Sequence, residues 1–445
     1  MAKVDLSVTV SGVTFPNPVM PGSSDLVCDE KGVERCLRNG VGGIVIKSVT
    51  PTHFRTKARP YHFFFRRFGP GLSHAWISKG SVDVKEPEEY AEKYMPKMVK
   101  RCREAGVPLI ASIMCGGDPE EWAREGKRFE EAGADMLELN LSCPHASFQT
   151  GQLSGRTVGE EMETVVAIIK RLKETVSIPV MPKLSITLEP FLNHVKRWEE
   201  AGADLICAHN TPYGLMIDVE KEVPFGTLGA GGYLLGRAML PWSLARVVEM
   251  RRVVSVPVVG VGGIYQPMDA IMYMLVGCPL VQVASAAFEY GAKFFKRVVK
   301  GMEAWMERKG YSSLEQFVGK VYPLAALHAT PELIPMEWPF PPPQVKSSPV
   351  IPVVDMAKCT LCGKCEDFCV EEVFTVDKVG RRVLVEHQGR CTGCGDCVGW
   401  CPPYAITLVE EKTGQLVWNN QGLARPYRPE NWRRKPDPVP GLVVL

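Results

Sequence analysis

The first residues of the chain alternate between large apolar and smaller or polar side chains, which predicts a β-hairpin. Every second position from Val4 to Val10 is apolar, with Val at three of them and Leu at position 6. Ser11 and Gly12 then provide a turn into the short β-rich segment 13–15. We therefore expect two short antiparallel strands at the start of the chain.

After the hairpin, short runs rich in Val, Ile and Leu recur along the chain, and each is long enough for one buried strand. The runs are nearly continuously apolar, as in parallel sheets that are covered on both faces. There are eight of them, at residues 19–23, 43–49, 108–114, 136–143, 179–184, 205–210, 257–263 and 280–286.

Amphipathic segments with apolar residues three and four positions apart lie between and after these runs, which predicts helices. Glu-Ala-Gly occurs at 104–106, 131–133 and 200–202, and a glycine at such a place is typical of a helix C-terminus. The predicted helices include residues 119–134, 159–175, 188–203, 243–253 and 294–309.

Eight β/α units within one stretch of chain favour a closed (β/α)8 TIM barrel, of the α/β class, over an open doubly wound sheet. The reactive residues of such barrels lie at the C-terminal ends of the strands. The small or polar residues at the predicted strand ends are Ser23, Lys47, Asn140, Cys143, Lys183, Asn210, Gly262, Gly263 and Ser285.

The sequence predicts four segments. Residues 1–330 form the barrel, and 331–352 form a proline-rich linker, because Pro stiffens and extends a chain. Residues 353–412 hold clustered cysteines, and 413–445 form a C-terminal tail that becomes proline-rich from Arg425.

Composition is that of a globular protein, with 45% hydrophobic and 23% charged residues among 445. The formal net charge is +2, which provides no basic field for nucleic acid or an anionic membrane. The first residues lack a signal-peptide pattern, and no run of 18 apolar residues occurs. We expect a cytoplasmic protein that binds neither nucleic acid nor membrane.

Cysteine usage points to metal, because 8 of the 15 cysteines lie between residues 359 and 401. A disulfide framework is not indicated, since such frameworks belong to short secreted chains. Two motifs of the form C-x2-C-x2-C-x3-C account for the eight: Cys359, Cys362, Cys365 and Cys369, then Cys391, Cys394, Cys397 and Cys401.

This spacing is the bacterial two-cluster ferredoxin pattern, in which the fourth cysteine of each motif binds the other cluster. Structural zinc is the alternative, but it needs only two C-x2-C pairs and leaves cysteines unexplained. We therefore expect two [4Fe-4S] clusters. One would be bound by Cys359, Cys362, Cys365 and Cys401, and the other by Cys369, Cys391, Cys394 and Cys397.

Two further features of the barrel are each ambiguous alone. Glycines at 260–263 and the small residues 284–286 end the last two strands, where barrels bind phosphate, but glycines also close tight turns. Lys47 and Lys183 lie in apolar runs, where they could stabilise an anionic reduced flavin or form ion pairs at the rim of the core.

The segment 137–145, Leu-Glu-Leu-Asn-Leu-Ser-Cys-Pro-His, resembles the strand-four motif of dihydropyrimidine dehydrogenases and class 1 dihydroorotate dehydrogenases. The likeness extends to the IASIMC, HNT, VGGI and LVQVASA segments and to the order of the two cysteine motifs, over about residues 4–410. The first motif departs slightly, with Val370 where Pro is usual.

The resemblance implies FMN in the barrel and Cys143 as the residue that transfers a proton during reduction of a C=C bond. It implies that Asn140, Asn210 and Thr211 bind the substrate ring. For the cofactor it implies binding by Gly22, Ser23, Lys47, Asn140, Lys183, Gly236, Gly262, Gly263, Ala284 and Ser285.

The sequence departs from the pyrimidine enzymes at two positions near the expected substrate. Asp118 stands where an Asn binds substrate in that family, and a carboxylate accepts but does not donate hydrogen bonds unless protonated. His209 replaces a smaller residue beside Asn210, and residues 61–68 add aromatic bulk. A related non-pyrimidine substrate therefore remains open.

No G-x-G-x-x-G dinucleotide motif follows a strand in this sequence. The resemblance is to the separate catalytic subunit of bacterial pyrimidine dehydrogenases, which implies a partner subunit that binds FAD and NAD(P)H, and we expect an oligomer. Two alternatives are a dihydroorotate-type dehydrogenase that works in the opposite direction and an electron-transfer subunit with an inactive barrel.

Overall fold

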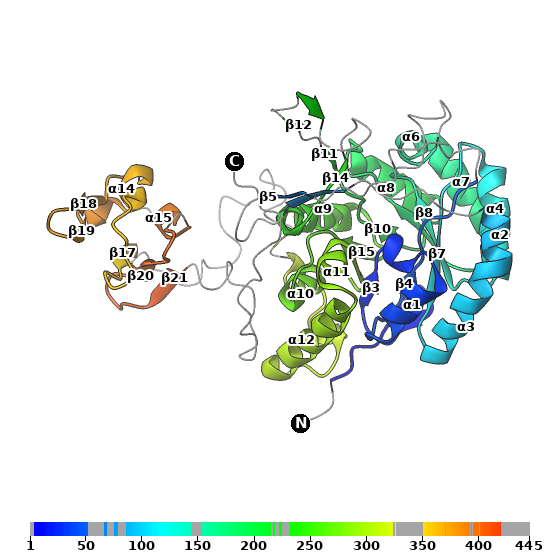
Figure 1. The fold of residues 1–445 in the computed structure, drawn as a ribbon, viewed down its shortest axis with the longest axis horizontal. Coiled ribbons are helices and arrows are strands. Elements are labelled where there is room, and N and C mark those ends of the chain that lie inside the picture. The colour runs from blue at the N-terminus through cyan, green and yellow to red at the C-terminus, as the bar shows by residue number, and fades with distance from the viewer. Residues whose placement is uncertain are drawn as a thin grey trace. The chain divides into compact units, whose positions relative to one another are not determined.

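The structure is a computed structural model in which the chain divides into two compact units, Met1–Leu333 and Ile334–Leu445 (Figure 1). Cys394, residues 144–153, most of the predicted linker, residues 61–65 and the predicted tail from 420 lie outside the described residues. The described residues are 4–51, 66–68, 75–78, 86–143, 154–214, 217–218, 222–224, 232–323, 325, 350–369, 371–391, 393, 395–399 and 401–419.

The first unit is an eight-stranded parallel barrel, which confirms the predicted fold class and all eight predicted strands (Figure 1). The hydrogen-bonded order is β3-β16-β15-β10-β9-β8-β7-β4. Gly42 N donates to Val19 O at 2.8 Å and joins the first strand to the second. The strands are β3 Val19–Pro21, β4 Ile44–Val45, β7 Leu109–Ile113, β8 Met136–Asn140, β9 Val180–Lys183, β10 Ile206–Cys207, β15 Val258–Val261 and β16 Val281–Val283.

Helices surround the strands and cover them with apolar faces, because their apolar residues recur at helical spacing. The predicted glycine caps are confirmed at Gly106, Gly133 and Gly202, which all have positive φ. The α-helices of eight or more residues are α1 Glu30–Leu37, α3 Met95–Ala105, α4 Pro119–Glu131, α7 Met162–Thr175, α8 Phe191–Glu200, α9 Leu240–Val253, α10 Pro267–Leu275 and α12 Lys293–Lys309. Shorter helical segments include η1 Asp25–Val27, α2 Pro87–Glu89, η3 Tyr90–Tyr94, α6 Arg156–Glu160, η4 Arg237–Met239, α11 Ser285–Tyr290 and η5 Leu314–Gln316.

The predicted N-terminal hairpin forms from β1 Val8–Val10 and β2 Val13–Phe15. It lies at the N-terminal end of the barrel strands, where Ser11 Oγ donates to Asp204 O at 3.0 Å. Val10 and Phe15 belong to one buried cluster with side chains from all eight strands or the residues beside them. Eight of the barrel members form an inner layer, one from each strand or the residue beside it: Met20, Val45, Ile110, Met136, Met181, Leu205, Val259 and Leu280. The cluster also includes Cys207, two positions after Leu205.

A second, antiparallel sheet of four short strands was not predicted from the sequence. It pairs segments from two long connections, the one after β4 and the one after β10, so it forms only when the barrel brings them together. Its order is β11 Tyr213–Gly214, β14 Gly232–Leu235, β6 Ala75–Ser78 and β5 Arg66–Phe68. A further pair, β12 Ile217–Asp218 and β13 Val223–Pro224, lies in the later connection.

The second unit contains a small core of its own, formed with the cysteine segments. Its sheets are β17 Val350–Val354, β20 Ile406–Glu410 and β21 Leu416–Asn419 in one group, and β18 Phe374–Asp377 with β19 Arg382–Val385 in the other. Two one-turn helices, α14 Lys364–Phe368 and α15 Asp396–Gly399, follow the cysteine loops.

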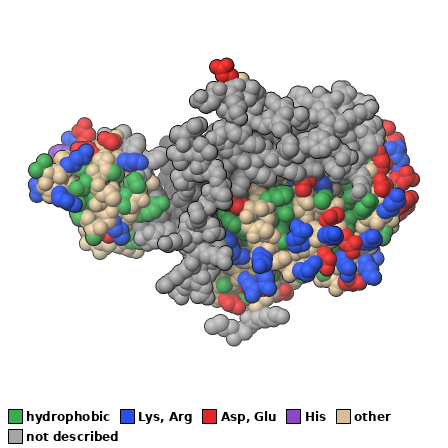
Figure 2. All heavy atoms as spheres, viewed as in Figure 1, with side chains coloured by type: hydrophobic (Ala, Val, Ile, Leu, Met, Phe, Trp, Pro, Cys, Tyr) green, Lys and Arg blue, Asp and Glu red, His purple; other side chains and the backbone are tan. Residues whose placement is uncertain are grey.

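The described surface shows no segregation of charge in the view of Figure 2, where basic and acidic side chains are interspersed over the barrel unit. Among the described residues, no helix is both long and apolar enough to cross a membrane.

Candidate functional site

A ring of polar side chains lies directly above the apolar inner layer of the barrel. Side chains two positions apart on a strand share a face, so the residue two positions after each inner-layer residue also faces the interior. In most barrels such interior layers are filled by branched apolar residues. Here six strands place polar or ionisable residues there: Lys47, Ser112, Glu138, Lys183, Cys207 and Gln282.

Lys183, Glu138 and Gln282 form a closed, buried triangle within this ring. Lys183 Nζ donates to Gln282 Oε1 at 2.8 Å and lies 3.5 Å from Glu138 Oε2. Gln282 Nε2 donates to the same Glu138 oxygen at 2.7 Å. The three residues are 7%, 0% and 1% exposed, so the charges of the ion pair are compensated inside the protein and not by water.

The ammonium of Lys183 keeps its proton in this setting. Burial by itself lowers the pKa of an ammonium, but the neighbouring Cys207 and Glu138 side chains outweigh it and raise the pKa of Lys183 above its ordinary value. Burial raises the pKa of the Cys207 thiol to about 12. Cys207 is therefore a neutral thiol at pH 7, and we assign the stabilisation of the Lys183 charge to Glu138.

Asn140 is held in one orientation by serines from two strand ends. Its Nδ2 donates to Ser48 Oγ at 2.8 Å, and its Oδ1 accepts from both Ser142 N and Ser142 Oγ. Ser48 also contacts Ser23 Oγ at 3.1 Å and Ser112 Oγ at 2.8 Å. The structure thus brings together the predicted residues Ser23 and Asn140 through Ser48, which the sequence analysis did not identify.

Cys143 lies three residues beyond the end of β8, and the returning end of the following loop packs on it. Arg156 N donates to Cys143 O at 3.0 Å. Gly155 has φ +53°, and a Cβ at this position would come within 2.4 Å of Cys143 O. Ser154, just before it, is fully buried. The backbone of Cys143 is therefore packed closely against residues 155 and 156.

Asn210 lies next to this segment and uses its hydrogen-bonding groups within the protein. Its Nδ2 donates to Ser142 O at 3.4 Å, and its Oδ1 accepts from Thr211 N at 2.8 Å. His209 Nδ1 lies 2.5 Å from Asn210 O and must donate, because a carbonyl only accepts. Burial lowers the pKa of His209 to about 4, so the imidazole is neutral at pH 7.

The glycines after β15 make a tight turn that only glycine can adopt. Gly262 and Gly263 have φ +107° and +70°. A Cβ on Gly262 would lie 2.5 Å from Ser243 Oγ and 3.0 Å from His209 Cε1. A Cβ on Gly263 would lie 2.4 Å from Leu240 N. His209 therefore contacts the glycine turn on one side and Asn210 on the other.

The neighbouring strand end offers backbone donors as well. Ala284 is the N-cap of α11 and provides no side-chain acceptor for the first N–H groups of that helix, which include that of Ser285. Gly22 N donates to Val283 O at 2.9 Å, which holds β3 beside β16. Gly236 is buried, has φ +123° and precedes η4. Backbone amides, small residues and a buried cation at the strand ends fit a phosphorylated flavin.

Two predicted residues have partners away from the triangle. Lys47 Nζ lies 3.3 Å from Asp25 Oδ1, and both side chains are partly exposed, at 18% and 24%. Asp118 is the N-cap of α4, where its carboxylate accepts from Glu120 N at 3.0 Å, and it is exposed. Its predicted role toward substrate stays a prediction, and its capping role is what the structure describes.

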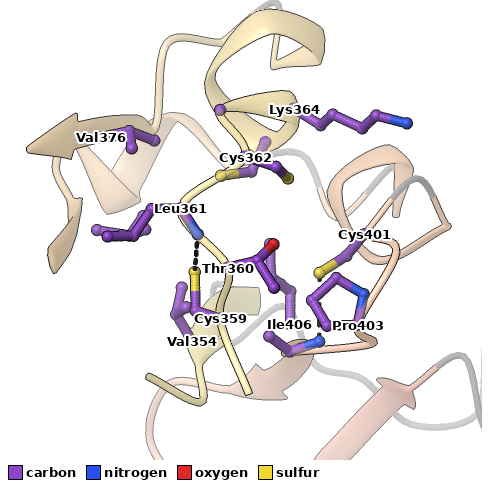
Figure 3. A pocket seen from close by; sticks show the side chains of 14 residues that line it. Val354, Cys359, Thr360, Leu361, Cys362, Lys364, Val376, Cys401, Pro403 and Ile406 are labelled. Carbon is purple, nitrogen blue, oxygen red and sulfur yellow. Dashed lines mark hydrogen bonds between the residues drawn. The ribbon is translucent and has the colours of Figure 1, made fainter. Parts of the chain in front are cut away.

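In the second unit, four of the predicted iron ligands line one cavity, namely Cys359, Cys362, Cys365 and Cys401 (Figure 3). Leu361 N donates to Cys359 Sγ at 3.4 Å, and Ala405 N donates to Cys401 Sγ at 3.2 Å. Amide donors to sulfur favour the thiolate form that binds iron. A cavity bounded by four cysteines with such donors fits one [4Fe-4S] cluster.

The other four predicted ligands are only partly described. Cys369, Cys391 and Cys397 lie against the small core, and Val373 N donates to Cys369 Sγ at 3.4 Å. Cys394 lies outside the described residues. Cys369 does not line the first cavity, which agrees with its predicted use for a second cluster.

Five residues of this site were not predicted from the sequence: Glu138, Gln282, Ser112, Ser48 and Ser142. A signal for the first three was present, because each is a polar residue two positions after an apolar residue within a buried strand. Period two alone therefore places them inside the barrel. Their hydrogen-bond partners come from other strands and have no signal in the local sequence.

Comparison with known proteins agrees with both units. The family model described as dihydroorotate dehydrogenase matches residues 5–306, and that described as 4Fe-4S dicluster domain matches residues 358–415. The chain is 31% identical over 331 residues to the dihydroorotate dehydrogenase B (NAD(+)) catalytic subunit of Thermococcus kodakarensis, covering 72% of this chain and 99% of that protein.

A second kind of relative covers more of the chain. The NAD-dependent dihydropyrimidine dehydrogenase subunit PreA of Escherichia coli is 27% identical over 385 residues, covering 83% of this chain and 87% of that protein. The family match implies FMN, and the dicluster match implies two [4Fe-4S] clusters. The chain belongs to the dihydroorotate dehydrogenase family, carries a 4Fe-4S dicluster domain, and is an oxidoreductase that acts on CH–CH bonds.

Proposed function

We propose that this chain is the catalytic subunit of a dihydropyrimidine dehydrogenase-type enzyme, which reduces an activated C=C bond in a pyrimidine-like ring. The observation that carries the proposal is the cluster unit on the same chain as the barrel. The match to the Escherichia coli protein covers 83% of the chain, more than the whole barrel unit of residues 1–333. It therefore continues into the cluster unit.

The barrel residues would hold the flavin for this reaction. FMN, when bound, would supply hydride to one carbon of the double bond. Lys183 and Lys47 would hold positive charge beside the ring, and Gly22, Ser23 and Asn140 would contact it. The backbone of Gly236, Gly262, Gly263, Ala284 and Ser285 would hold its phosphate, because amides at these strand ends suit anions.

Addition of hydride to one carbon requires a proton at its neighbour, and we assign this proton to the Cys143 thiol. A positioned cysteine thiol is one of the side chains that can act as a general acid toward a reacting carbon. Asn140, Asn210, Thr211 and Asp118 would bind the substrate ring. Since a carboxylate at 118 offers only acceptors, the substrate would present donors there.

The cluster unit would carry electrons singly between the barrel and a partner. We assign Cys359, Cys362, Cys365 and Cys401 to one cluster, supported by the cavity that they line. Cys369, Cys391, Cys394 and Cys397 are assigned to the other. The two relatives compared above are named as subunits that use NAD, which supports a partner subunit with FAD and an NAD(P)H site, in a hetero-oligomer.

A second candidate is a dihydroorotate-type dehydrogenase, because the Thermococcus kodakarensis protein is the more identical of the two relatives, at 31%. That match covers 99% of the relative with 331 residues. The relative therefore has no room for a cluster unit like the one here, which favours the first candidate.

The test is an anaerobic assay of the purified chain with its partner subunit. NAD(P)H oxidation is followed with uracil, thymine and a panel of other cyclic enones, and dihydroorotate is offered with an artificial electron acceptor. We expect turnover with a pyrimidine. Turnover with dihydroorotate alone would establish the second candidate, and turnover only with a non-pyrimidine enone would keep the reaction but replace the substrate.

A further inference from the structure

The buried triangle of Lys183, Glu138 and Gln282 contains two residues to which the proposed reaction assigns no role. Glu138 lies on β8 and Gln282 on β16, on opposite sides of Lys183 in the strand order. Both are fully buried in the barrel interior. A buried carboxylate and a buried amide inside a barrel are costly unless every polar group is satisfied.

The hydrogen bonds of the triangle are directional. The Lys183 ammonium only donates and the Glu138 carboxylate only accepts. Gln282 must therefore turn its oxygen toward Lys183 and its NH2 toward Glu138, as observed at 2.8 Å and 2.7 Å. Gln282 thus bridges the two charges, whose direct separation is 3.5 Å.

The remaining oxygen of Glu138 is also satisfied. Glu138 Oε1 accepts from Ser112 Oγ at 3.1 Å, and Ser112 contacts Ser48, which holds Asn140. One hydrogen-bonded network therefore connects the Lys183 charge to the amide of Asn140. Removing the carboxylate would leave the ammonium buried without an opposite charge, which is strongly unfavourable.

We propose that Glu138 and Gln282 are positioning residues for Lys183, which keep its ammonium charged and fixed at the end of β9, so that it acts as a permanent cation toward the bound flavin. The inference rests on the proposed use of FMN, and it adds a carboxylate and an amide to the residues that control the flavin.

The proposal makes a pH-dependent prediction. The titratable groups that face Lys183 are Glu138, Cys207 and His209. Cys207 and His209 are neutral at pH 7 because of their burial, so among the described residues that face Lys183 the negative charge comes from Glu138. In Glu138→Gln, burial is no longer offset, and the pKa of Lys183 falls. The flavin would then lose its cation as the pH rises.

The experiment measures the equilibrium between the bound flavin and a redox dye of known potential, in the holoprotein without substrate, at pH 6.5 and pH 8.5. A cation beside the ring favours the reduced flavin. For each pH we divide the equilibrium constant of Glu138→Gln by that of the wild type. Between pH 6.5 and pH 8.5 this ratio should shift toward oxidised flavin by about tenfold or more, the factor that corresponds to one pKa unit.

A double variant separates positioning from a structural effect. If Glu138 acts through Lys183, the pH-dependent change must disappear when Glu138→Gln is combined with Lys183→Met, because coupled residues are not additive. Gln282→Leu, which keeps both charges, should show a smaller shift in the same direction. Glu125→Gln is the matched control, since Glu125 is also a buried carboxylate but lies on α4 between two arginines.

Two results would overturn the proposal: a Glu138→Gln equilibrium constant that equals the wild-type constant at both pH values, or a change that persists in the Lys183→Met background. Both are independent of the substrate, so failure to reduce pyrimidines would contradict the proposed function without affecting this inference. A wild-type protein that binds no FMN would overturn both. If Glu138→Gln does not retain flavin, Gln282→Leu decides the question.

Discussion

The two reactive regions of the chain are built in opposite ways. The cluster unit takes its predicted ligands from two short motifs within residues 359–401, and four of the cysteines line one cavity. The barrel site takes its polar residues from strands that range from β3 to β16, more than 250 residues apart. The first site is local in sequence, whereas the second is assembled by the closure of the sheet.

Because of this difference, the two sites should respond differently to single substitutions. A cluster ligand has one chemical task, and losing its sulfur removes one bond to iron. A residue of the barrel network, such as Ser48 or Gln282, contacts partners on two or three strands. Its replacement therefore changes the position or charge of its hydrogen-bond partners, and activity should fall partially and not be lost completely.

The largest effect is expected from Cys362→Ala in the cluster unit. Loss of a thiolate ligand should remove one cluster, lower the iron content by about half, and abolish turnover driven by the partner subunit. The flavin should stay bound, because the barrel unit has its own core. Iron analysis and flavin absorbance check this. Cys28→Ala, at an exposed thiol, is the control, and its iron content should not change.

Cys143→Ala tests the other site alone. Substrate turnover should fall by roughly 10² to 10⁴, the usual range for a general acid, while FMN and iron contents stay at wild-type values. Reduction of the flavin by the partner subunit should also be unchanged, since no proton to substrate is involved. Undiminished turnover in a stopped-flow assay would remove Cys143 from the proposed mechanism.

His209 should make the barrel sensitive to acid. Its pKa is about 4 in the folded chain and near 6.5 when unfolded, so the unfolded state binds the extra proton between these values. The free energy of unfolding should therefore be highest above pH 6.5 and decrease by about 3 kcal/mol as the pH falls toward 4. Denaturant unfolding at several pH values measures this. In His209→Gln the loss should be smaller by that amount; an identical pH profile would contradict the assignment.

The smallest effect is the difference between substitutions at two glycines that have similar backbone conformations. Gly263 and Gly310 have φ +70° and +76°, but a Cβ would collide with Leu240 only at Gly263 and would meet open space at Gly310. Gly310→Ala should cost about 1 kcal/mol of stability from strain. Gly263→Ala should cost about 1–3 kcal/mol more and weaken FMN binding. Equal stability and equal flavin affinity would show that the turn is not constrained.

Several structural features could be predicted because they depend on neighbours in sequence. The eight strands and the hairpin follow from runs and alternation of apolar residues, and three helix ends follow from Glu-Ala-Gly. Asp118 illustrates the limit. The resemblance predicts that it lies near the substrate, which stays a prediction, and only the structure shows that its carboxylate caps α4.

By itself, the sequence determined the barrel, the cluster motifs and the strand ends at which we propose that the chemistry occurs, since hydrophobic period and cysteine spacing are short-range properties. Only the tertiary structure decided that Glu138 and Gln282 enclose Lys183, that Ser48 holds Asn140, and that His209 joins Asn210 to Gly262. Those contacts depend on which strands become neighbours across a closed barrel. Partners far apart in sequence leave no local pattern, because the free energy that selects them comes from burying and pairing polar groups together.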